Sequence, residues 1–489
     1  MELGILLTGV CLSLISSCSG QTYNQPEQIH INYGVDPTVM TVTWVTFSDT
    51  PVSIAEYGEA MLSKVAKGVS DKFIDGGAMK RIIFMHRVNM TGLTPGKQYR
   101  YHVGSPDGWS AVYNFYAMSD SSKWQPKFAV FGDFGSSNAQ SLGRLQKETQ
   151  EGHFDFAVHV GDLAYNLHTY DATVGDQFMR QMEPIAAYLP YMTCVGNHEW
   201  AYNFSNYKYR FSMPAAGGDG QNMYFSYDVG PIHFIAWANE LYYYTYYGIE
   251  QIFNQYKWLE NDLKKANLPE NRAKHPWIIV YGHRPMYCSN SDDGQHCINL
   301  NNTCRVGYKE GGWKSPEDLF YNYGVDVMLS AHEHSYERCF PVYNLTVCNG
   351  TGSNPYNNPD APVHIITGSA GCSEGTDPFE PKPWPWSAFH SDDYGYNRFQ
   401  VFNSTHLYIE YVSDIKDGAV IDKMWLIKDK HGPYLYNCHK KQRPYPIPPE
   451  MMDKELILKY TKRRRFHHRD TGNQKFDDIA DLLEFKNIN

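Results

Sequence analysis

The sequence predicts an all-β domain followed by a larger domain in which strands and helices alternate. Three observations carry this prediction. The spacing of apolar residues changes near residue 125, aromatic residues make up 15% of the chain, and its 489 residues suffice for about two to four domains. With 42% hydrophobic and 20% charged residues, the composition is typical of a globular protein that buries a large core.

Residues 21–120 are expected to form a β-sandwich. Apolar and polar positions alternate in 40–45 and in 99–103, and glycine and proline separate the segments, as in Gly92 to Gly96. Apolar spacing of helical period is absent from this part of the sequence. We therefore expect strands and turns alone.

Residues 125–440 are expected to form the second domain. One helix is predicted to begin at the capping residue Ser315, with Pro316 in its first turn, and to end at Gly324. Another is predicted over 249–266, where the apolar side chains on one face are Ile249, Ile252, Phe253, Tyr256, Leu259 and Leu263. The predicted strands are 127–131, 156–160, 191–195, 232–237, 277–281, 325–329 and 363–367. This order indicates parallel or mixed sheets covered by helices.

The two ends of the chain are expected to lie outside both domains. Residues 1–20 combine an apolar run with a small-residue ending, which is typical of a secretory signal peptide. Residues 441–489 contain a basic run and a short acidic amphipathic piece, and we expect a solvated tail. Six N-x-Ser/Thr acceptors favour a secreted or lysosomal protein that carries N-linked glycans: Asn89, Asn203, Asn301, Asn344, Asn349 and Asn403.

Charge and hydropathy exclude two classes of partner. The formal net charge of −10 repels nucleic-acid phosphates, so we expect no nucleic-acid partner. Beyond the signal peptide, the sequence has no uncharged apolar run of about 18 residues, so we expect no membrane span. The subunit number stays open, with a homodimer as one option.

The cysteines predict disulfides. Of ten cysteines, Cys11 and Cys18 lie in the signal peptide, which leaves eight, an even number that suits an oxidising compartment. Short separations favour a bond between Cys339 and Cys348 and a bond between two of Cys288, Cys297 and Cys304. Cys194 lies in an apolar strand and is expected to be a free core thiol.

Polar motifs follow five of the predicted strands. In an open α/β sheet the carboxyl ends of parallel strands meet in one crevice, so these motifs can converge although they are far apart in sequence. Glycines before several of them allow tight turns into the crevice. The side chains that gather there are Asp133, Asp162, Tyr165, Asn197, His283, His332 and His334.

These seven side chains supply only nitrogen and oxygen ligands. They are too many for one tetrahedral ion but suit two neighbouring metal ions that share a carboxylate. The alternation of His332, Glu333 and His334 would place the imidazoles on opposite sides of an extended strand. We therefore expect a bent loop at this motif.

The five motifs resemble those of the purple acid phosphatases within the metallophosphoesterase superfamily. They read Gly132-Asp133-x-Gly135, Gly161-Asp162-x-x-Tyr165, Gly196-Asn197-His198-Glu199, Val280-x-x-His283 and His332-x-His334. The resemblance covers roughly residues 25–440 and departs at Ala331, where the family usually has glycine; we expect little damage from the small alanine. It implies a fibronectin-III-like β-sandwich ahead of a metallophosphoesterase α/β sandwich with two central mixed sheets flanked by helices.

The resemblance also implies the metals and the reaction. A ferric ion would be held by Asp133, Tyr165 and His334, and Asp162 would bridge to a second ion, which is Zn(II), Mn(II) or Fe(II). That second ion would be held by Asn197, His283 and His332. The implied activity is an acid phosphatase that hydrolyses small phosphate monoesters by attack of a metal-bound hydroxide. Of the catalytic residues, His198 would hydrogen-bond the substrate phosphate or the leaving oxygen, and His296 would protonate the leaving group.

Several alternatives stay open. A phosphodiesterase or nucleotide pyrophosphatase of the same superfamily would use the same chemistry, although Tyr165 argues against it. A non-enzymatic secreted binding glycoprotein is the alternative from another class. Glu199 and Arg338 are interpreted as supports of the site. The tyrosines at 242–247 are interpreted as a surface or interface aromatic patch rather than a rim of the crevice. The sequence does not name the physiological substrate.

Overall fold

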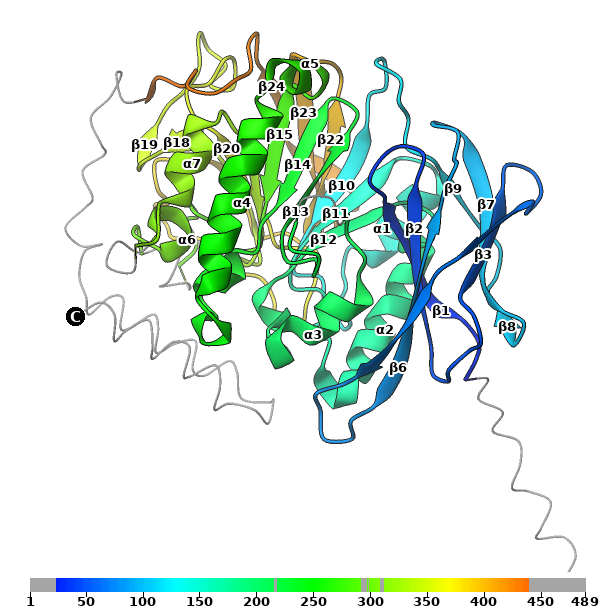
Figure 1. Ribbon diagram of the computed structural model, residues 1–489. Coiled ribbons are helices and arrows are strands. Elements are labelled where there is room, and N and C mark those ends of the chain that lie inside the picture. Colours follow the sequence, from blue (N-terminus) through cyan, green and yellow to red (C-terminus); the bar gives the residue numbers. More distant parts are fainter. Residues whose placement is uncertain (1–22, 215–217, 292–296, 298, 308–311, 439–489) are drawn as a thin grey trace, which may run out of the picture.

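The computed structural model describes residues 23–214, 218–291, 297, 299–307 and 312–438 (Figure 1). The predicted signal peptide and tail lie outside these residues, and so does His296. The described chain forms a β-sandwich and an α/β domain that pack side by side; in Figure 1 the sandwich is blue and the α/β domain runs from cyan through green and yellow to orange.

The N-terminal domain is a sandwich of two antiparallel sheets. One sheet has the strand order β1 (Glu27–Tyr33), β2 (Met40–Thr46), β6 (Ile82–Met90) and β5 (Val69–Ile74). The other has the order β4 (Lys64–Lys67), β3 (Ile54–Gly58), β7 (Gln98–Ser105) and β8 (Gly108–Trp109), with β9 (Tyr113–Tyr116) also paired to β7. No helix occurs among the described residues before β10, which confirms the prediction of strands and turns for this domain.

Strand β2 is buried on both faces, although its sequence alternates. Val42 and Trp44 point into the sandwich core. On the opposite face, the Thr43 hydroxyl donates to the Ser212 hydroxyl of the α/β domain at 2.8 Å, and Val45 packs in a cluster with Ala172 of the α/β domain. The alternation therefore marks a strand with a core face and a domain-interface face.

The α/β domain contains two mixed sheets. The six-stranded sheet has the order β12 (Tyr191–Cys194), β11 (Phe156–Val160), β10 (Lys127–Phe131), β22 (Gly395–Val401), β23 (His406–Ser413) and β24 (Ala419–Ile427). The seven-stranded sheet has the order β13 (Phe225–Val229), β14 (Ile232–Ala236), β15 (Trp277–Tyr281), β16 (Val327–Ser330), β20 (Val363–Thr367), β17 (Tyr336–Cys339) and β21 (Ser387–Ser391). A two-stranded hairpin joins β18 (Val342–Tyr343) to β19 (Thr346–Val347).

The two sheets pack face to face through aromatic side chains. Phe128 of β10 and Phe156 of β11 meet Phe234 of β14 edge to face, with ring centroids 5.5 and 5.7 Å apart. Helices cover the outer faces, with α4 and α7 on one side and α1 and α2 on the other (Figure 1). The helices are α1 (Leu142–Gln150), α2 (Thr169–Ala186), α3 (Ala201–Arg210), α4 (Glu250–Ala266), α5 (Pro269–Lys274), α6 (Thr303–Val306) and α7 (Pro316–Asn322).

Both predicted helices are present. Helix α7 begins as expected, because the Ser315 side chain accepts a hydrogen bond from the Asp318 amide at 3.1 Å, and Gly324 follows its end at φ +68°. Helix α4 buries a narrower face than predicted. Ile252, Leu259 and Leu263 are buried, but Ile249 and Phe253 are 45% and 42% exposed, because they lie at the edge of the face that meets the sheet.

One of the two predicted disulfides is wrong. Cys288 bonds to Cys297, as one of the allowed pairs, and Cys304 is a buried free thiol. Cys348, however, bonds to Cys438 and not to Cys339. The reason is the direction of the strands: Cys339 ends β17 and points into the main core, whereas Cys348 follows β19 and packs with Tyr321, Tyr436 and Cys438 in a separate cluster. Cys194 is a free thiol in the core, as predicted.

Candidate metal centre

The predicted donors lie at the carboxyl ends of strands from both sheets. Asp133, Asp162 and Asn197 follow β10, β11 and β12, which are neighbouring parallel strands of the six-stranded sheet. His283 follows β15 of the seven-stranded sheet, and His332 follows its parallel neighbour β16. The crevice therefore forms between two facing sheets, and each sheet supplies part of the donor set.

Left-handed backbone turns aim several donors inward. Asp133, Asp162, Tyr165 and His332 have φ angles of +53°, +49°, +52° and +71°. Such values are costly for residues other than glycine and persist where neighbouring groups hold them. Here the donors hold one another. An Asp133 carboxylate oxygen accepts from the His332 amide at 2.8 Å, and an Asp162 oxygen accepts from the His198 amide at 2.8 Å.

Two of the predicted glycines are required by close approach. A Cβ at Gly161 would lie 2.6 Å from Nδ1 of His283, and a Cβ at Gly196 would lie 2.2 Å from Oδ1 of Asp162. These positions admit no side chain without moving a donor. Ala331 follows β16, and its methyl group lies beside Gly132. A Cβ added at Gly132 would be only 2.5 Å from that methyl group. Ala331 is thus accommodated by the glycine opposite it.

Three donors form one compact set. The Tyr165 hydroxyl lies 2.9 Å from Oδ1 of Asp133 and 2.9 Å from Nε2 of His334, and that nitrogen lies 3.4 Å from the same Asp133 oxygen. Ligand atoms bound to one transition-metal ion at about 2.0–2.2 Å lie roughly 3 Å apart. The spacing of this set therefore fits a single shared cation.

A second set lies beside the first. Nε2 of His283 is 3.1 Å from Oδ2 of Asp162 and 3.0 Å from Oδ1 of Asn197. Asp162, His283 and His332 each offer one ligand atom, and these atoms all lie within 4.8 Å of one another. Nε2 of His283 is also 3.9 Å from Oδ1 of Asp133, so the two sets adjoin. The arrangement can accept two neighbouring cations.

The bend predicted for the His332 to His334 segment is present. His332 adopts its left-handed conformation directly after β16, and His334 is turned to the Tyr165 side of the crevice. The imidazole of His332 faces that of His283, with ring centroids 5.1 Å apart. The two histidines of this motif therefore serve different donor sets.

The buried carboxylates and imidazoles of the site shift one another's pKa values. Asp133 and Asp162 are fully buried. Burial raises the pKa of Asp133; for Asp162 burial acts in the same direction, but the charges of His283 and His198 outweigh it and lower the pKa. Burial alone would lower the pKa of His283, yet the two carboxylates raise it to about 10.

The phenol of Tyr165 also indicates that the site suits a cation. Burial, and then the nearby carboxylate of Asp133, raise its pKa well above the ordinary value of about 10. Only a strong Lewis acid beside the oxygen would convert it to a phenolate. Among the described residues, no lysine or arginine forms an ion pair with Asp133 or Asp162, so the donor set fits external cations.

Glu199 supports the donors through the backbone. Its buried carboxylate accepts hydrogen bonds from the amides of Asp162, Leu163 and Gly196 at 2.9–3.0 Å. Burial and the charge of Asp162 raise its pKa to about 8. Arg338 lies elsewhere: its guanidinium makes two hydrogen bonds to Asp422 of β24, at 2.7 and 2.8 Å. It holds β17 against the other sheet and contacts no donor.

His198 faces the crevice from the loop after β12. Its ring lies 4.1 Å from that of Tyr165, and Nδ1 is hydrogen-bonded to the side-chain oxygen of Asn166. Nε2 is 3.8 Å from Oδ2 of Asp162. With 17% of its side chain exposed, His198 can meet a substrate held at the donors.

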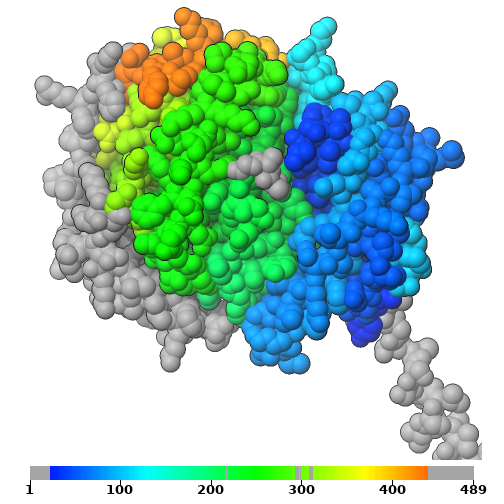
Figure 2. Space-filling view, viewed as in Figure 1, coloured from blue at the N-terminus to red at the C-terminus, as the bar shows by residue number. Residues whose placement is uncertain are grey.

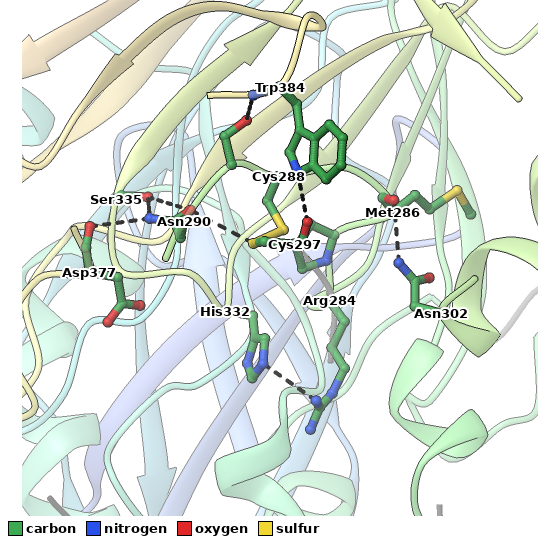
Figure 3. The surroundings of a disulfide bond; sticks show 12 residues. Arg284, Met286, Cys288, Asn290, Cys297, Asn302, His332, Ser335, Asp377 and Trp384 are labelled. Carbon is green, nitrogen blue, oxygen red and sulfur yellow. Dashed lines mark hydrogen bonds between the residues drawn. A yellow bond between two sulfur atoms is a disulfide. The ribbon is translucent and has the colours of Figure 1, made fainter. Parts of the chain in front are cut away.

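Sequence reasoning missed several neighbours of the donors. Arg284 directly follows His283, and its guanidinium lies 3.4 Å from Nε2 of His332, beside the Cys288–Cys297 disulfide (Figure 3). Cys372 places its sulfur 3.4 Å from Nδ1 of His334, and Asp377 accepts from the His334 amide at 2.7 Å. Arg284 could have been identified because it is next to a predicted ligand in the sequence. Cys372 and Asp377 lie in a loop without a predicted ligand, so no signal in the sequence pointed to them.

The tyrosines at 242–247 were also misinterpreted. Tyr242, Tyr243 and Tyr244 are buried, so the surface half of that interpretation is wrong for these three. The Tyr244 hydroxyl donates to the backbone oxygen of Asn197 at 3.2 Å, and Arg284 lies over the Tyr243 ring at 4.2 Å. Tyr243 and Tyr244 thus pack beside the donor loops, after the short turn Asn239–Tyr242, whereas Tyr242 packs against Trp237 and Trp313.

Comparison with known families agrees with this architecture. Residues 26–117 match a family model described as the purple acid phosphatase N-terminal domain, and residues 126–336 match the calcineurin-like phosphoesterases. Residues 361–423 match a model described as iron/zinc purple acid phosphatase-like protein C. Together these models follow the chain in the order of its two domains.

Individual proteins are similar over most of the chain. "Acid phosphatase type 7" of Danio rerio is 53% identical over 84% of this chain and 93% of its own length, and that of Homo sapiens is 47% identical over 87% and 97%. "Purple acid phosphatase 18" of Arabidopsis thaliana is 30% identical over 82% and 84%. The structure of purple acid phosphatase PPD1 from yellow lupin superposes with a TM-score of 0.68, at 25% identity, over 83% of this chain and 75% of that one. The chain belongs to the purple acid phosphatase family of the calcineurin-like phosphoesterases.

Proposed function

We infer that the protein is a metal-dependent acid phosphatase that hydrolyses small phosphate monoesters. Its membership of the family supports this function, and relatives of high identity are named as acid phosphatases. The observation that carries the inference is the buried crevice in which Asp133 and Asp162 face phenol, amide and imidazole donors but form no ion pair with a described lysine or arginine. The binuclear metal centre that the family implies agrees with a donor set that can accept two cations.

We propose a specific assignment of the metals. Fe(III) is held by Asp133, Tyr165 and His334, because a buried phenol becomes a ligand only beside a strong Lewis acid. Zn(II), Mn(II) or Fe(II) is held by Asn197, His283 and His332, with Asp162 bridging the two. The name of the matching C-terminal family model, which mentions iron and zinc, supports this choice of metals. When bound, the two ions would supply positive charge for the phosphate oxygens and an activated water.

The chain's own residues would position the ester and move its protons. His198 reaches the crevice between Tyr165 and Asp162, and its hydrogen bond to Asn166 fixes the ring so that Nε2 faces the substrate. We propose that His198 donates a hydrogen bond to the phosphate. His296 lies outside the described residues; we propose it as the acid that protonates the leaving oxygen, which would favour acidic conditions.

Monoester specificity is tested by comparing two aryl phosphates. We expect the protein to hydrolyse 4-nitrophenyl phosphate at least about tenfold faster than bis(4-nitrophenyl) phosphate at acidic pH, because a dianion is attracted more strongly to the positively charged centre. A preference for the diester would favour the phosphodiesterase or nucleotide pyrophosphatase alternative. Absence of both turnover and metal would favour the non-enzymatic binding glycoprotein.

We also propose that the protein follows the secretory route, with residues 1–20 as signal peptide, 21–120 and 125–440 as the two domains, and 441–489 as tail. Both disulfides and five exposed acceptor asparagines, Asn89, Asn301, Asn344, Asn349 and Asn403, support secretion or lysosomal delivery with N-linked glycans. None of the described helices combines the length and apolarity needed to cross a bilayer. A homodimer remains a proposal for the assembly, tested by light scattering of the purified protein.

A further inference from the structure

The N-terminal sandwich touches the catalytic domain at two unusual turns. Residues Tyr170 to Ala172 and Tyr202 to Phe204 are both runs of three non-glycine residues with φ angles between +51° and +66°. Each run begins five residues after a proposed ligand, Tyr165 in the first case and Asn197 in the second. Left-handed runs of this kind persist only where surrounding contacts fix them.

Hydrogen bonds connect both turns to the ligand loops. In the first, the Ala172 amide donates to the oxygen of His168 at 3.0 Å, three residues after Tyr165. In the second, the Phe204 amide donates to Trp200 at 3.1 Å, and the Trp200 amide donates to the oxygen of Asn197 at 3.2 Å. The turns also approach each other, since the rings of His168 and Tyr202 lie 5.9 Å apart. Displacement of either turn would therefore shift a ligand loop.

One loop of the sandwich, residues 75–81 between β5 and β6, contacts both turns. The Met79 amide donates to Oδ1 of Asp171 at 2.8 Å, in the first turn. At the second, a Cβ on Gly76 would lie only 2.2 Å from the Tyr202 ring, so loop and ring are in direct contact. Oδ1 of Asp75 accepts from Nδ2 of Asn206, just beyond the second turn, at 2.9 Å.

Further contacts fix the loop itself and the first turn. Ala172 is buried among side chains of the sandwich, with Val45, Phe73, Ile83 and Met85. Arg81 forms an ion pair with Asp176 of helix α2. The hairpin that ends in this loop reaches the lower ends of α2 and α3 in Figure 1, and Figure 2 shows the blue domain pressed against the green one.

From these contacts we propose that the N-terminal sandwich positions the metal centre. Its 75–81 loop holds the two left-handed turns, and through them the loops that carry Tyr165 and Asn197. This inference rests on the proposed function, since it concerns the ligands of that site. It gives the sandwich a role in catalysis without contact between the sandwich and the substrate.

The experiment compares four variants of the full-length protein. Gly76→Ala adds a methyl group against Tyr202, and Asp171→Ala removes the acceptor of the Met79 amide. Asp171→Asn keeps an acceptor oxygen and is the conservative rescue. Gly143→Ala, in helix α1 with no atom within 4 Å of the new Cβ, is the matched glycine control. Thermal unfolding establishes that each variant is folded at the assay temperature.

We expect Gly76→Ala to lower kcat on 4-nitrophenyl phosphate by about ten- to a hundredfold, with KM changed less than about threefold, because misplacement of reacting groups acts on the chemical step. Iron bound to the Tyr165 phenolate, as proposed above, would give a visible absorption, and this absorption should weaken or shift in parallel. Asp171→Ala should show the same changes to a smaller extent, and Asp171→Asn and Gly143→Ala should match the wild type. A purely structural contact would lower the unfolding temperature without moving the absorption or kcat.

Folded Gly76→Ala and Asp171→Ala proteins with wild-type kcat and absorption would overturn the inference. If Gly76→Ala does not fold, the pair Asp171→Ala and Asp171→Asn decides the question by the same measurements. A wild type without metal and turnover would contradict the proposed function, and this inference with it. A wild type that has both, with unchanged variants, contradicts this inference alone.

Discussion

Strand β16 lies between two buried clusters of charged groups that contain different kinds of cationic side chain. Just before it, the buried carboxylate of Asp326 is bonded to the Lys428 ammonium group and lies 3.5 Å from the Arg272 guanidinium. Just after it, His332 faces a crevice in which Asp133 and Asp162 have imidazole and phenol neighbours. At the first end the chain supplies its own cations.

The difference separates a structural cluster from a functional one. Burial raises the pKa of Asp326, but Lys428, His431 and Arg272 outweigh it and hold the pKa below its usual range. A carboxylate balanced in this way has no need of a ligand. Around Asp133 and Asp162 the described chain supplies imidazoles and no lysine or arginine ion pair, so the two ends of the same strand have a structural ion cluster and the proposed metal site.

The largest expected effect comes from removing the shared carboxylate. Asp162→Ala should lose both metal ions and lower kcat/KM by more than the roughly thousandfold that loss of a single transition-state contact can cost. Metal analysis and turnover of 4-nitrophenyl phosphate measure this. Normal turnover by the variant would contradict the contrast between the two clusters, because the crevice would then be a structural cluster like that of Asp326.

The opposite end should respond in stability and not in activity. Lys428→Met leaves Asp326 buried without its nearest cation, and we expect a loss of about 3–5 kcal/mol in the free energy of unfolding, measured with denaturant. Metal content and kcat of the folded variant should stay at wild-type values. Lys423→Met, at an exposed position of β24, is the control and should change stability little. Loss of metal in Lys428→Met would show that the two clusters are not separate.

His198 tests the substrate side of the crevice. His198→Asn should keep both ions, because the imidazole is not among the proposed ligands, and should lower kcat/KM about a hundredfold through loss of its hydrogen bond to the phosphate. His153→Asn, at a half-exposed histidine distant from the donors, is the matched control. A His198→Asn protein that has lost its metal would place this residue among the ligands instead.

The smallest effect concerns a histidine for which the chain supplies the counter-charges. In β14, Nδ1 of His233 is 2.6 Å from Asp228 and Nε2 is 2.8 Å from Asp262. Burial lowers its pKa, but both carboxylates outweigh this and raise the pKa to about 9. Protonated His233 therefore stabilises the fold fully below about pH 6.5, and this contribution is lost as the pH rises to about 9.

The measurement is the unfolding free energy of wild type and His233→Gln between pH 6 and about 9.5. We expect the wild type to be more stable by about 1 kcal/mol at the acidic end, where solvent screens the partly exposed pair, and the difference to vanish at the alkaline end. A difference that does not depend on pH would show that His233 is not a charged member of the cluster.

The sequence predicted that the candidate donors lie at strand ends, because a strand end is a local feature. Asp133, Asp162 and His283 each follow a short apolar strand and a glycine, and this pattern survives in any arrangement of the strands. The spacing of residues did not predict that the strands belong to two facing sheets. That expectation came from the family resemblance. Strand order depends on long-range pairing, which local patterns do not encode.

Features that depend on long-range packing were missed for the same reason. Cys348 bonds to Cys438, 90 residues away, because both reach one aromatic cluster. Cys372 and Asp377 approach His334 from a loop without strand or helix. Tyr244 is buried by a turn that brings it under Asn197. No short sequence pattern predicts any of these contacts.

The metal content of the purified wild-type protein tests the central claim most directly. We predict one iron and one divalent ion per chain, together with a visible absorption that disappears in Tyr165→Phe while the divalent ion stays bound. A protein that hydrolyses phosphate monoesters at full rate without bound metal would contradict the account.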